Sequence, residues 1–562
     1  MRYPRYPNET IESYRQDAGE LENALIDEYR EGGITRRELL QRGSALGISI
    51  PFLSLLSGVP AAWAAPRAVR RSTAGTLRVG SSPISSSLEP PLLQQLETLA
   101  VSHIPGEQLV FADKNSVLKP RLATSWKPSN GAKSWTFQIR QGVKFHDGTP
   151  LTVDDVVATF ERLLTKDSQA LSSYKGVISP GNVKKVDSKS VRFDLDAPNG
   201  FFPYLLGQMT YQAIILPKSY KLPSDITKPG EWTSKMNGTG PFMLKQNRGA
   251  AGLSFVANPN YWGGRPSLDA VEFNFLEDQP RVTALQSGQI DLAVQVSYQG
   301  AQQLDRANMQ VIPLRTATHR YLHMNVKKKP FNDVRVRQAI ALALNRPQIV
   351  RGLWGKFAEV GDDSPMWPGY AFTDKSVPQR KQNLAKARAL LKAAGAENLK
   401  LTLSCYRAFE MPDYAQRVAQ ALKQIGIDCS VKVYTGAQYF DGVSFGATGK
   451  LAPWLGVDFG IVDYGHRPVP LTYLNAALKS GGVWNAARYS NKKFDRMVAD
   501  FVAATTIKTQ KQRARKIQLH LLNETPVIYS YFYNFIAAAS PKVKGYVPDG
   551  IAVVNLRGVS IG

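Results

Sequence analysis

Cysteine and histidine are scarce in this chain of 562 residues, which has two of the first and six of the second. Cys405 and Cys429 lie toward opposite strand ends of an expected β-α-β unit, so a disulfide between them is disfavoured. With few thiol and imidazole ligands and no zinc-ligand spacing, we expect neither a bound metal nor a cofactor. Neither an H-E-x-x-H motif nor a P-loop occurs, and we do not expect an enzyme.

Long hydrophobic runs are also missing, and no segment after the N-terminal region reaches membrane-spanning length. The apolar stretch Ala45–Pro60 is short and broken by polar residues. Arg36 and Arg37 precede it, and a small-x-small cleavage pattern between Ala64 and Ala65 follows it. This arrangement predicts a twin-arginine signal peptide, export of the folded chain, and a periplasmic or extracytoplasmic location.

Acidic residues are outnumbered, 45 against 70 lysines and arginines, which gives a formal charge of +25. Past residue 64 there are 63 basic and 36 acidic residues, a balance of +27. The lysines are scattered, and no compact basic helix or RNP-like motif occurs, so we expect no nucleic-acid partner. A solvated cationic surface is the simpler interpretation, and an anionic envelope surface remains an open alternative partner.

The chain is too long for one ordinary core, so we expect two or more lobes. No repeat and no low-complexity linker divides it. The first half alternates between strand-like and turn-rich segments. In the second half, one amphipathic helix is expected over 330–350 and another over 383–395, followed by a strand–helix–strand unit over 399–434. The pattern predicts an α/β fold.

The segment "VKFHDGTPLTVDDVVATF" (143–160) has the composition of a metal or acid/base cluster. Its spacing favours a structural role. The run from His146 to Thr149 has turn chemistry, and Thr152 precedes Asp155 by three residues at the start of an apolar series, which is a capping-box pattern.

The same region, extended to "LKPRLATSWKPSNGAKSWTFQIRQGVKFHDGTPLTVDDVVATFERL", resembles the signature of the peptide/nickel family of solute-binding proteins of ABC importers, solute-binding protein family 5. Further matching segments follow in the family's order. They are "NGTGPFML" (237–244), "NPNYWGGRPSLDAVEF" (258–273), "ALQSGQIDLA" (284–293), "HMNVKKKPFNDVRVRQAIALALNR" (323–346) and "WNAARYSNKKFDRMV" (484–498).

The resemblance implies an α/β, two-lobed periplasmic-binding-protein fold of the large peptide-binding type, with a hinge between the lobes. The implied divisions are a signal peptide over 1–64, lobe I over 65–318 with an extra subdomain at about 110–235, lobe II over 319–536, and a return to lobe I over 537–562. The implied partners are a peptide or similar charged solute and the permease and ATP-binding subunits of an ABC transporter, with the chain acting as a monomer.

The resemblance also suggests where a ligand binds. In peptide-binding members an aspartate pairs with the ligand's ammonium, and Asp463 matches it. His466 and Arg467 replace a second acid, so they are candidates for binding a carboxylate or phosphate. The remaining expected contacts are Tyr464, the pre-aspartate strand at Gly460 and Ile461, Tyr321 with His323 beside it on a crossing strand, and Gln94 in a segment beside which ligand backbone would add as a strand.

Two other functions stay open at this point. The first is a secreted hydrolase with Asp458 and Asp463 as paired acids, although residues five apart on a strand project to opposite faces. The second is a receptor for a non-peptide ligand such as an opine, an amino sugar or a metal chelate. A chaperone or adhesion role of the basic surface would add to binding without replacing it.

Overall fold

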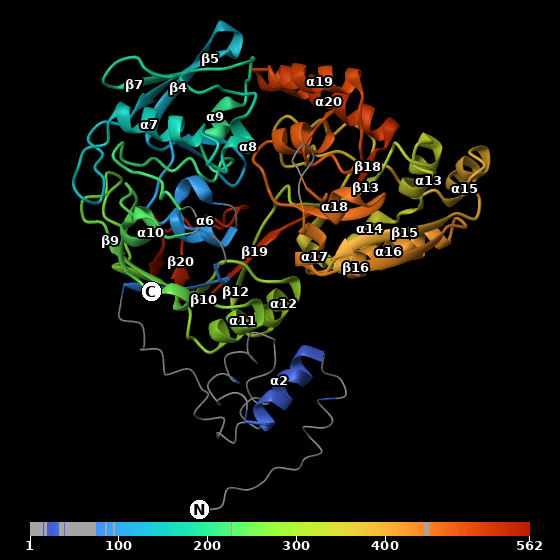
Figure 1. Cartoon of the computed structure of the whole chain (residues 1–562), viewed down its shortest axis with the longest axis horizontal. Helices are drawn as coiled ribbons and strands as arrows, with labels where there is room; N and C mark the ends of the chain where they lie inside the picture. Colours follow the sequence, from blue (N-terminus) through green and yellow to red (C-terminus); the bar gives the residue numbers. More distant parts are fainter. Residues whose placement is uncertain are drawn as a thin grey trace, which may run out of the picture. The chain divides into compact units, whose positions relative to one another are not determined.

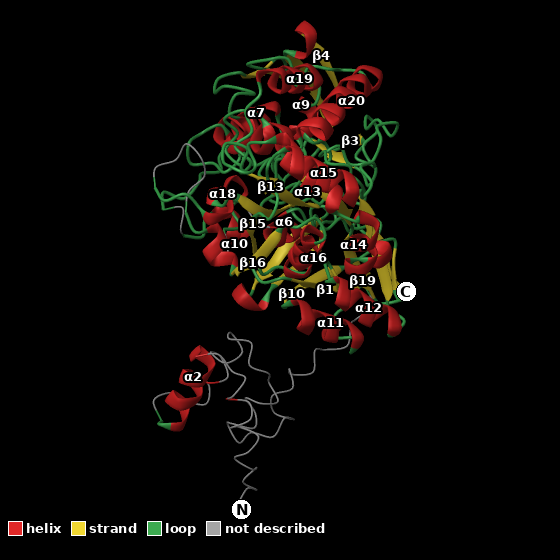
Figure 2. Ribbon diagram, turned by 90° about the vertical axis from the view of Figure 1, so that its right-hand side faces the viewer, coloured by secondary structure: helices red, strands yellow, loops and turns green. Residues whose placement is uncertain are grey.

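A computed structural model describes the chain as two compact units, residues 1–72 and 73–562. The first unit contains helix α2 (Glu20–Arg30), and Arg15 lies 2.7 Å from Asp27 of this helix. All other elements whose bounds the structure describes belong to the second unit (Figure 1, Figure 2). The described residues are 15, 20–32, 39, 75–84, 87–93, 96–225, 228–442 and 449–562.

The first large sheet, sheet A, has seven strands in the order β12-β19-β11-β1-β10-β9-β8. β1 runs parallel to β10 and β11, and the other recorded pairs are antiparallel. Helices α11 (Asp278–Gln286) and α12 (Tyr298–Arg306) pack against it (Figure 1). The strands are β1 (Thr76–Ser81), β8 (Phe242–Asn247), β9 (Leu253–Ala257), β10 (Ala270–Phe275), β11 (Leu292–Ala293), β12 (Gln310–Leu314) and β19 (Phe535–Ala539).

The second large sheet, sheet B, has six strands in the order β14-β18-β13-β17-β15-β16. Its two faces belong to different cores: one packs on α13 to α16, the other on α19 and α20 and the segments before them. The strands are β13 (His319–Met324), β14 (Ala358–Val360), β15 (Lys400–Tyr406), β16 (Asp428–Tyr434), β17 (Phe459–Tyr464) and β18 (Val527–Tyr533). The helices are α13 (Val334–Ala343), α14 (Arg346–Leu353), α15 (Leu384–Ala393), α16 (Met411–Lys423), α17 (Gly436–Phe440), α18 (Pro453–Gly456), α19 (Lys492–Val502) and α20 (Ile507–Glu524).

A third, four-stranded sheet has the order β4-β5-β7-β6 and packs on helix α7 (Val153–Leu163). At the start of α7, the Asp155 carboxylate accepts hydrogen bonds from the Thr152 backbone N–H and hydroxyl at 2.7 and 2.6 Å. His146 contacts the backbone oxygens of Met236 and Gly240 at 3.2 and 3.0 Å. The structural interpretation of residues 143–160 is therefore confirmed. The strands are β4 (Ala123–Ser129), β5 (Ser134–Ile139), β6 (Val183–Lys185) and β7 (Ser190–Asp194).

The remaining short elements lie around these sheets. The hairpin β2–β3 follows α6, and β20 pairs with β21 near the C-terminus. They are β2 (Val110–Ala112), β3 (Leu118–Pro120), β20 (Val543–Lys544), β21 (Ser560–Ile561), α6 (Leu96–Ser102), α8 (Leu171–Tyr174), α9 (Phe202–Leu205), α10 (Glu231–Lys235) and the π-helical turn η5 (Tyr473–Leu478).

The prediction of a single helix over 330–350 is wrong in one respect: the structure has two helices there, α13 and α14. Pro347 explains the break, because proline lacks the backbone N–H that would bond the Ala343 carbonyl four residues earlier, and its ring clashes with that carbonyl. Asn345 then caps the second helix by accepting a hydrogen bond from the Gln348 backbone N–H at 3.1 Å. The strand–helix–strand unit is confirmed as β15-α16-β16.

The two cysteines are free, and Cys405 is buried. On the parallel pair β15–β16, Cys429 is in register with Leu401, four residues from Cys405. The expected separation along the strands is therefore confirmed.

The chain passes between sheets A and B twice. It leaves β12 of sheet A and enters β13 of sheet B after residues 315–318. It returns from β18 to β19 through Asn534 alone. Each crossing is thus a short segment that leads directly from a strand of one sheet into a strand of the other.

Candidate ligand-binding site

The carboxyl ends of β15 and β17 meet at one edge of sheet B, because these neighbouring strands run parallel. The chain leaves β15 through α16, whose Tyr414 and Val418 pack in the core on one face. After β17 it enters the core on the opposite face, through Tyr473 and Leu474. Adjacent strands whose connections leave toward opposite faces define a topological switch point, the place where open α/β sheets bind ligands.

A three-residue charged cluster lies at this edge. Arg320 of β13 is the cross-strand neighbour of Asp463 in β17, and its Nη1 lies 2.5 Å from Asp463 Oδ1. The Nε and Nη2 atoms of Arg320 donate to the two carboxylate oxygens of Glu410 at 2.9 and 2.8 Å. Glu410 occupies this place because it immediately precedes α16. We call Arg320, Glu410 and Asp463 the edge cluster.

Two tyrosines of β18 complete the edge cluster. The Tyr533 hydroxyl accepts from Arg320 Nη1 at 2.8 Å and donates to Asp463 Oδ1 at 2.9 Å. The Tyr531 hydroxyl donates to Glu410 Oε1 at 2.6 Å. The Arg320 guanidinium also lies 4.6 Å from the centre of the Tyr533 ring. Each charged side chain of the cluster thus has a hydrogen-bond partner that fixes its orientation.

The edge cluster has one positive and two negative groups, and so a net charge of −1. The Arg320 side chain is fully buried, Glu410 is 6% exposed, and Asp463 is 28% exposed. Burial by itself lowers the pKa of Arg320, but Asp463 and Glu410 outweigh it and hold that pKa well above its usual value. Arg320 is therefore a permanent cation, and the excess negative charge is open to solvent at Asp463.

The segment after β17 carries the expected basic residues His466 and Arg467. Burial, assisted by the nearby Arg467 charge, lowers the pKa of His466 to about 3. The His466 ring accepts a hydrogen bond at Nδ1 from the Ala317 backbone N–H at 3.0 Å. The positive charge that we expected of His466 is thus absent at neutral pH; its contact with ligand stays a prediction.

Arg467 packs against an aromatic ring. Its guanidinium lies 5.0 Å from the centre of the Tyr211 ring, and its Nη1 donates to the His466 carbonyl at 2.8 Å. The Tyr370 hydroxyl donates to the Arg467 carbonyl at 2.7 Å. The Arg467 guanidinium is therefore held by the Tyr211 ring, and the Arg467 backbone by the Tyr370 hydroxyl.

The other expected contacts on β13 and β17 are buried. Tyr321 is fully buried and donates to the Ala477 carbonyl at 2.8 Å, while Ile461 is fully buried in the core on the face opposite Tyr464. Tyr464 stacks on Trp484 with ring centres 6.0 Å apart. Gly460 packs so closely that a Cβ there would lie 2.6 Å from the Nε2 atom of the buried His323.

A ligand strand added beside Gly460 conflicts with the topology. β17 is an inner strand of sheet B, and β15 pairs with it at Ser404 and Gly460. A ligand backbone can therefore pair with β17 only beyond Gly460, toward Asp463. Gln94, Arg36, Arg37, Ala64 and Ala65 lie outside the described residues.

Sequence reasoning missed Arg320 and Glu410. Arg320 had a visible signal, since it is the one charged residue in "HRYLHM", a strand whose other side chains favour burial. Glu410 had none, because it is far from both partners in sequence and only the fold brings it to Arg320.

Paired acid chemistry has no support in this geometry. Asp458 accepts from the Asn325 amide at 2.8 Å and lies 3.1 Å from Lys328, whereas Asp463 faces Arg320. The two acids are five positions apart along extended chain, a span of about 16 Å. Among the described residues, no cluster of three or more His, Cys, Asp or Glu side chains is arranged to hold a metal ion.

One short pattern shared with hydrolases does occur: residues 442–446 read G-x-S-x-G. The nucleophile turn of those enzymes connects a strand to a helix. Here helix α17 ends at Phe440, two residues before the pattern, so the strand that the turn requires is replaced by a helix. The pattern carries no argument for catalysis.

Two α/β sheets connected by two short crossings, with a charged edge at a switch point, define the class of the two-lobed periplasmic binding proteins. The putative peptide-binding protein AppA from Clostridium difficile has this fold, with a TM-score of 0.75 and 21% identity over 87% of this chain and 100% of that one. In the described part of the chain, no helix combines the length and apolar character that a membrane crossing requires.

Residues 117–462 match the family model of bacterial extracellular solute-binding proteins, family 5 Middle. The chain belongs to this family, as the sequence motifs predicted, and it is a solute-binding protein. It is 26% identical to the oligopeptide-binding protein AppA of Bacillus subtilis over 91% of this chain and 96% of that protein. It is equally identical to the heme-binding protein A of Haemophilus influenzae, over 80% and 85%.

Proposed function

We propose that this protein is an extracytoplasmic receptor that captures a peptide or a similar ammonium-bearing solute and delivers it to the permease and ATP-binding subunits of an ABC transporter. The observation that carries the proposal is the net charge of −1 at the switch point of sheet B. A ligand ammonium beside Asp463 would neutralise that charge through a charge-assisted hydrogen bond.

The relatives support this ligand class. Proteins named for oligopeptide and dipeptide binding match over most of their own lengths, 96% and 95%. A heme-binding relative shows that the same chain architecture also serves other solutes. In this proposal the edge cluster selects the ligand, because its negative charge favours a cationic group over a purely anionic or apolar solute.

The two sheets support the proposed division into lobes. Lobe I would be built on sheet A from residues 65–318, with residues 110–235 as a subdomain and 537–562 as the return. Lobe II would be built on sheet B from residues 319–536. The two crossings would be the hinge about which the lobes close on ligand. We also propose that the receptor acts as a monomer without catalytic activity.

Export through the twin-arginine pathway is part of the proposal, and it rests on Arg36, Arg37 and the cleavage pattern at Ala64 and Ala65. Replacing both arginines with lysine is expected to abolish export, because the pathway reads the arginine pair itself. Cell fractionation followed by immunoblotting checks this. Normal accumulation of the double variant outside the cytoplasm would show that another pathway exports the chain.

Native mass spectrometry of protein purified from the cell envelope tests the receptor function. The expected result is a retained small molecule that fragmentation identifies as carrying an ammonium group. A retained solute without any cationic group would contradict the proposed role of the edge cluster. A protein that arrives empty and then binds none of a set of short peptides in calorimetry would contradict the peptide assignment.

A further inference from the structure

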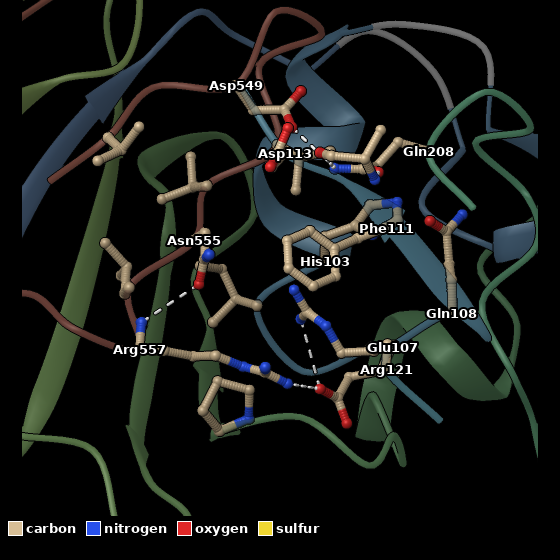
Figure 3. Close-up of a pocket in the computed structure, with 18 of the residues that line it drawn as sticks. His103, Glu107, Gln108, Phe111, Asp113, Arg121, Gln208, Asp549, Asn555 and Arg557 are labelled. Atoms are coloured by element: carbon tan, nitrogen blue, oxygen red, sulfur yellow. Dashed lines mark hydrogen bonds and ion pairs between the residues drawn. The ribbon is translucent and has the colours of Figure 1, made fainter. Parts of the chain in front are cut away.

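A polar cavity lies away from the edge cluster, on the side of sheet A (Figure 3). It has a volume of about 200 Å³, and its walls come from the segment after α6, from the β2–β3 hairpin and from the C-terminal residues 547–557. Apolar side chains such as Phe111 and Val553 form its sides. Its polar groups gather in two sets, which Figure 3 shows at opposite ends.

The first end holds two guanidinium groups around one carboxylate. The Glu107 side chain is completely buried and is contacted by both Arg121, at 3.5 Å, and Arg557. It also accepts hydrogen bonds from the Tyr261 hydroxyl at 2.9 Å and the Trp262 indole at 2.7 Å. Two cations against one anion give this end a net charge of +1.

Aromatic rings hold the two guanidinium groups in place. The Arg121 guanidinium lies 4.4 Å from the centre of the Phe111 ring, and that of Arg557 lies 5.0 Å from the Trp262 ring. The Nε atoms of both arginines are buried and have no hydrogen-bond partner among the described residues. Buried charged donors without an acceptor are costly, so this end is suited to a carboxylate.

The second end presents the Asp549 carboxylate. It accepts from the Gln208 amide at 2.8 Å and from the Ile551 backbone N–H at 2.9 Å. Burial raises the pKa of Asp549 to about 6. The neighbouring Asp113 instead accepts the turn hydrogen bonds of Asn115 and Val117. Asp549 is thus the group at this end that an ammonium would stabilise most.

The cavity is separate from the site on sheet B. No edge-cluster residue lines the cavity. A recess of about 20 Å³ adjoins it at Gln208 and Asp549 and extends to His466. That volume holds a water molecule but no solute group. Between the two charged ends, the Nε2 atom of His103 has no hydrogen-bond partner among the described residues, so a polar group crossing the cavity would find one there.

We propose that this cavity binds a second, small zwitterionic solute, with its carboxylate at Arg121 and Arg557 and its ammonium at Asp549. The solute class is that of short peptides and ω-amino acids, whose two charges are several bonds apart. The site goes beyond the proposed receptor function, because the residues that line this cavity are distinct from those of the edge cluster.

Calorimetric titration of the full chain with three matched probes tests the proposal. The probes are 5-aminopentanoate, which has both charges, pentanoate, which lacks the ammonium, and pentylamine, which lacks the carboxylate. The expected order has 5-aminopentanoate bound at least about tenfold more tightly than either single-charge probe, because each charged end contributes a charge-assisted hydrogen bond. Absence of binding, or equal binding of the three probes, would overturn the proposal.

Variants assign the binding to this cavity. Asp549→Asn is expected to remove the advantage of 5-aminopentanoate over pentanoate, and Arg557→Gln its advantage over pentylamine. Arg557→Lys keeps the charge and is expected to restore part of the loss. Asp458→Asn is the matched control, because Asp458 pairs with Lys328 outside both sites, and it is expected to leave probe binding unchanged. If Asp458→Asn weakens probe binding as much as the cavity variants do, or if the cavity variants leave it unchanged, the solute binds elsewhere and the proposal is wrong.

Discussion

Replacing Arg320 with methionine is expected to destabilise the protein by about 3–5 kcal/mol, because the change leaves buried carboxylate charge without its cation. Glu410 dominates this cost, since it is 6% exposed and loses both guanidinium hydrogen bonds. Asp463 contributes less because its 28% exposure gives it access to water. Urea denaturation of the variant and the parent protein measures the difference.

The pH dependence distinguishes lost charge pairing from lost packing. In the Arg320→Met variant the unpaired carboxylates favour protonation in the folded state, so the folded form binds more protons than the unfolded form. Stability then falls as pH rises. The destabilisation is therefore expected to be larger at about pH 8 than at about pH 5.

A second substitution provides the control. Adding Glu410→Gln to Arg320→Met is expected to recover part of the stability at the higher pH, because it removes the more deeply buried of the two unpaired charges. Destabilisation that does not change with pH, and no recovery in the double variant, would mean that Arg320 acts through packing alone.

Local signals in the sequence predicted local structure well. The Thr152–Asp155 pair predicted the start of α7, because a capping box is defined by residues three apart. The β15-α16-β16 unit was predictable because the spacing of its apolar residues is also a local property of the sequence. The break between α13 and α14 was missed because the apolar period continues through it, although Pro347 was visible.

The candidate site was only partly predictable, because its groups are far apart in sequence. Family resemblance pointed to Asp463. No short-range sequence pattern connects Asp463 with Arg320, its neighbour in the structure. Arg320 and Glu410 are 90 residues apart and meet only when β13 and the start of α16 lie on the same face of sheet B. The charge of the proposed site therefore came from the fold and not from a motif.

Asp463→Asn is expected to weaken the binding of an ammonium-bearing ligand at least tenfold, because truncating one partner of a desolvated charge pair costs about 2–5 kcal/mol. The fold is expected to tolerate the change, since Arg320 keeps both hydrogen bonds to Glu410. The substitution makes the edge cluster neutral, which removes the reason to prefer a cation. Calorimetry with alanyl-alanine and its N-acetyl derivative measures the effect.

The acetylated peptide provides an internal check on the role of Asp463. Acetylation removes the ammonium from the ligand, just as Asp463→Asn removes its partner from the protein. The two changes together are therefore expected to cost little more than either alone. Asp458→Asn is the matched control, because Asp458 lies at the other end of β17 and pairs with Lys328 instead. Additive losses from acetylation and Asp463→Asn, or an equal loss in Asp458→Asn, would show that Asp463 does not hold the ammonium.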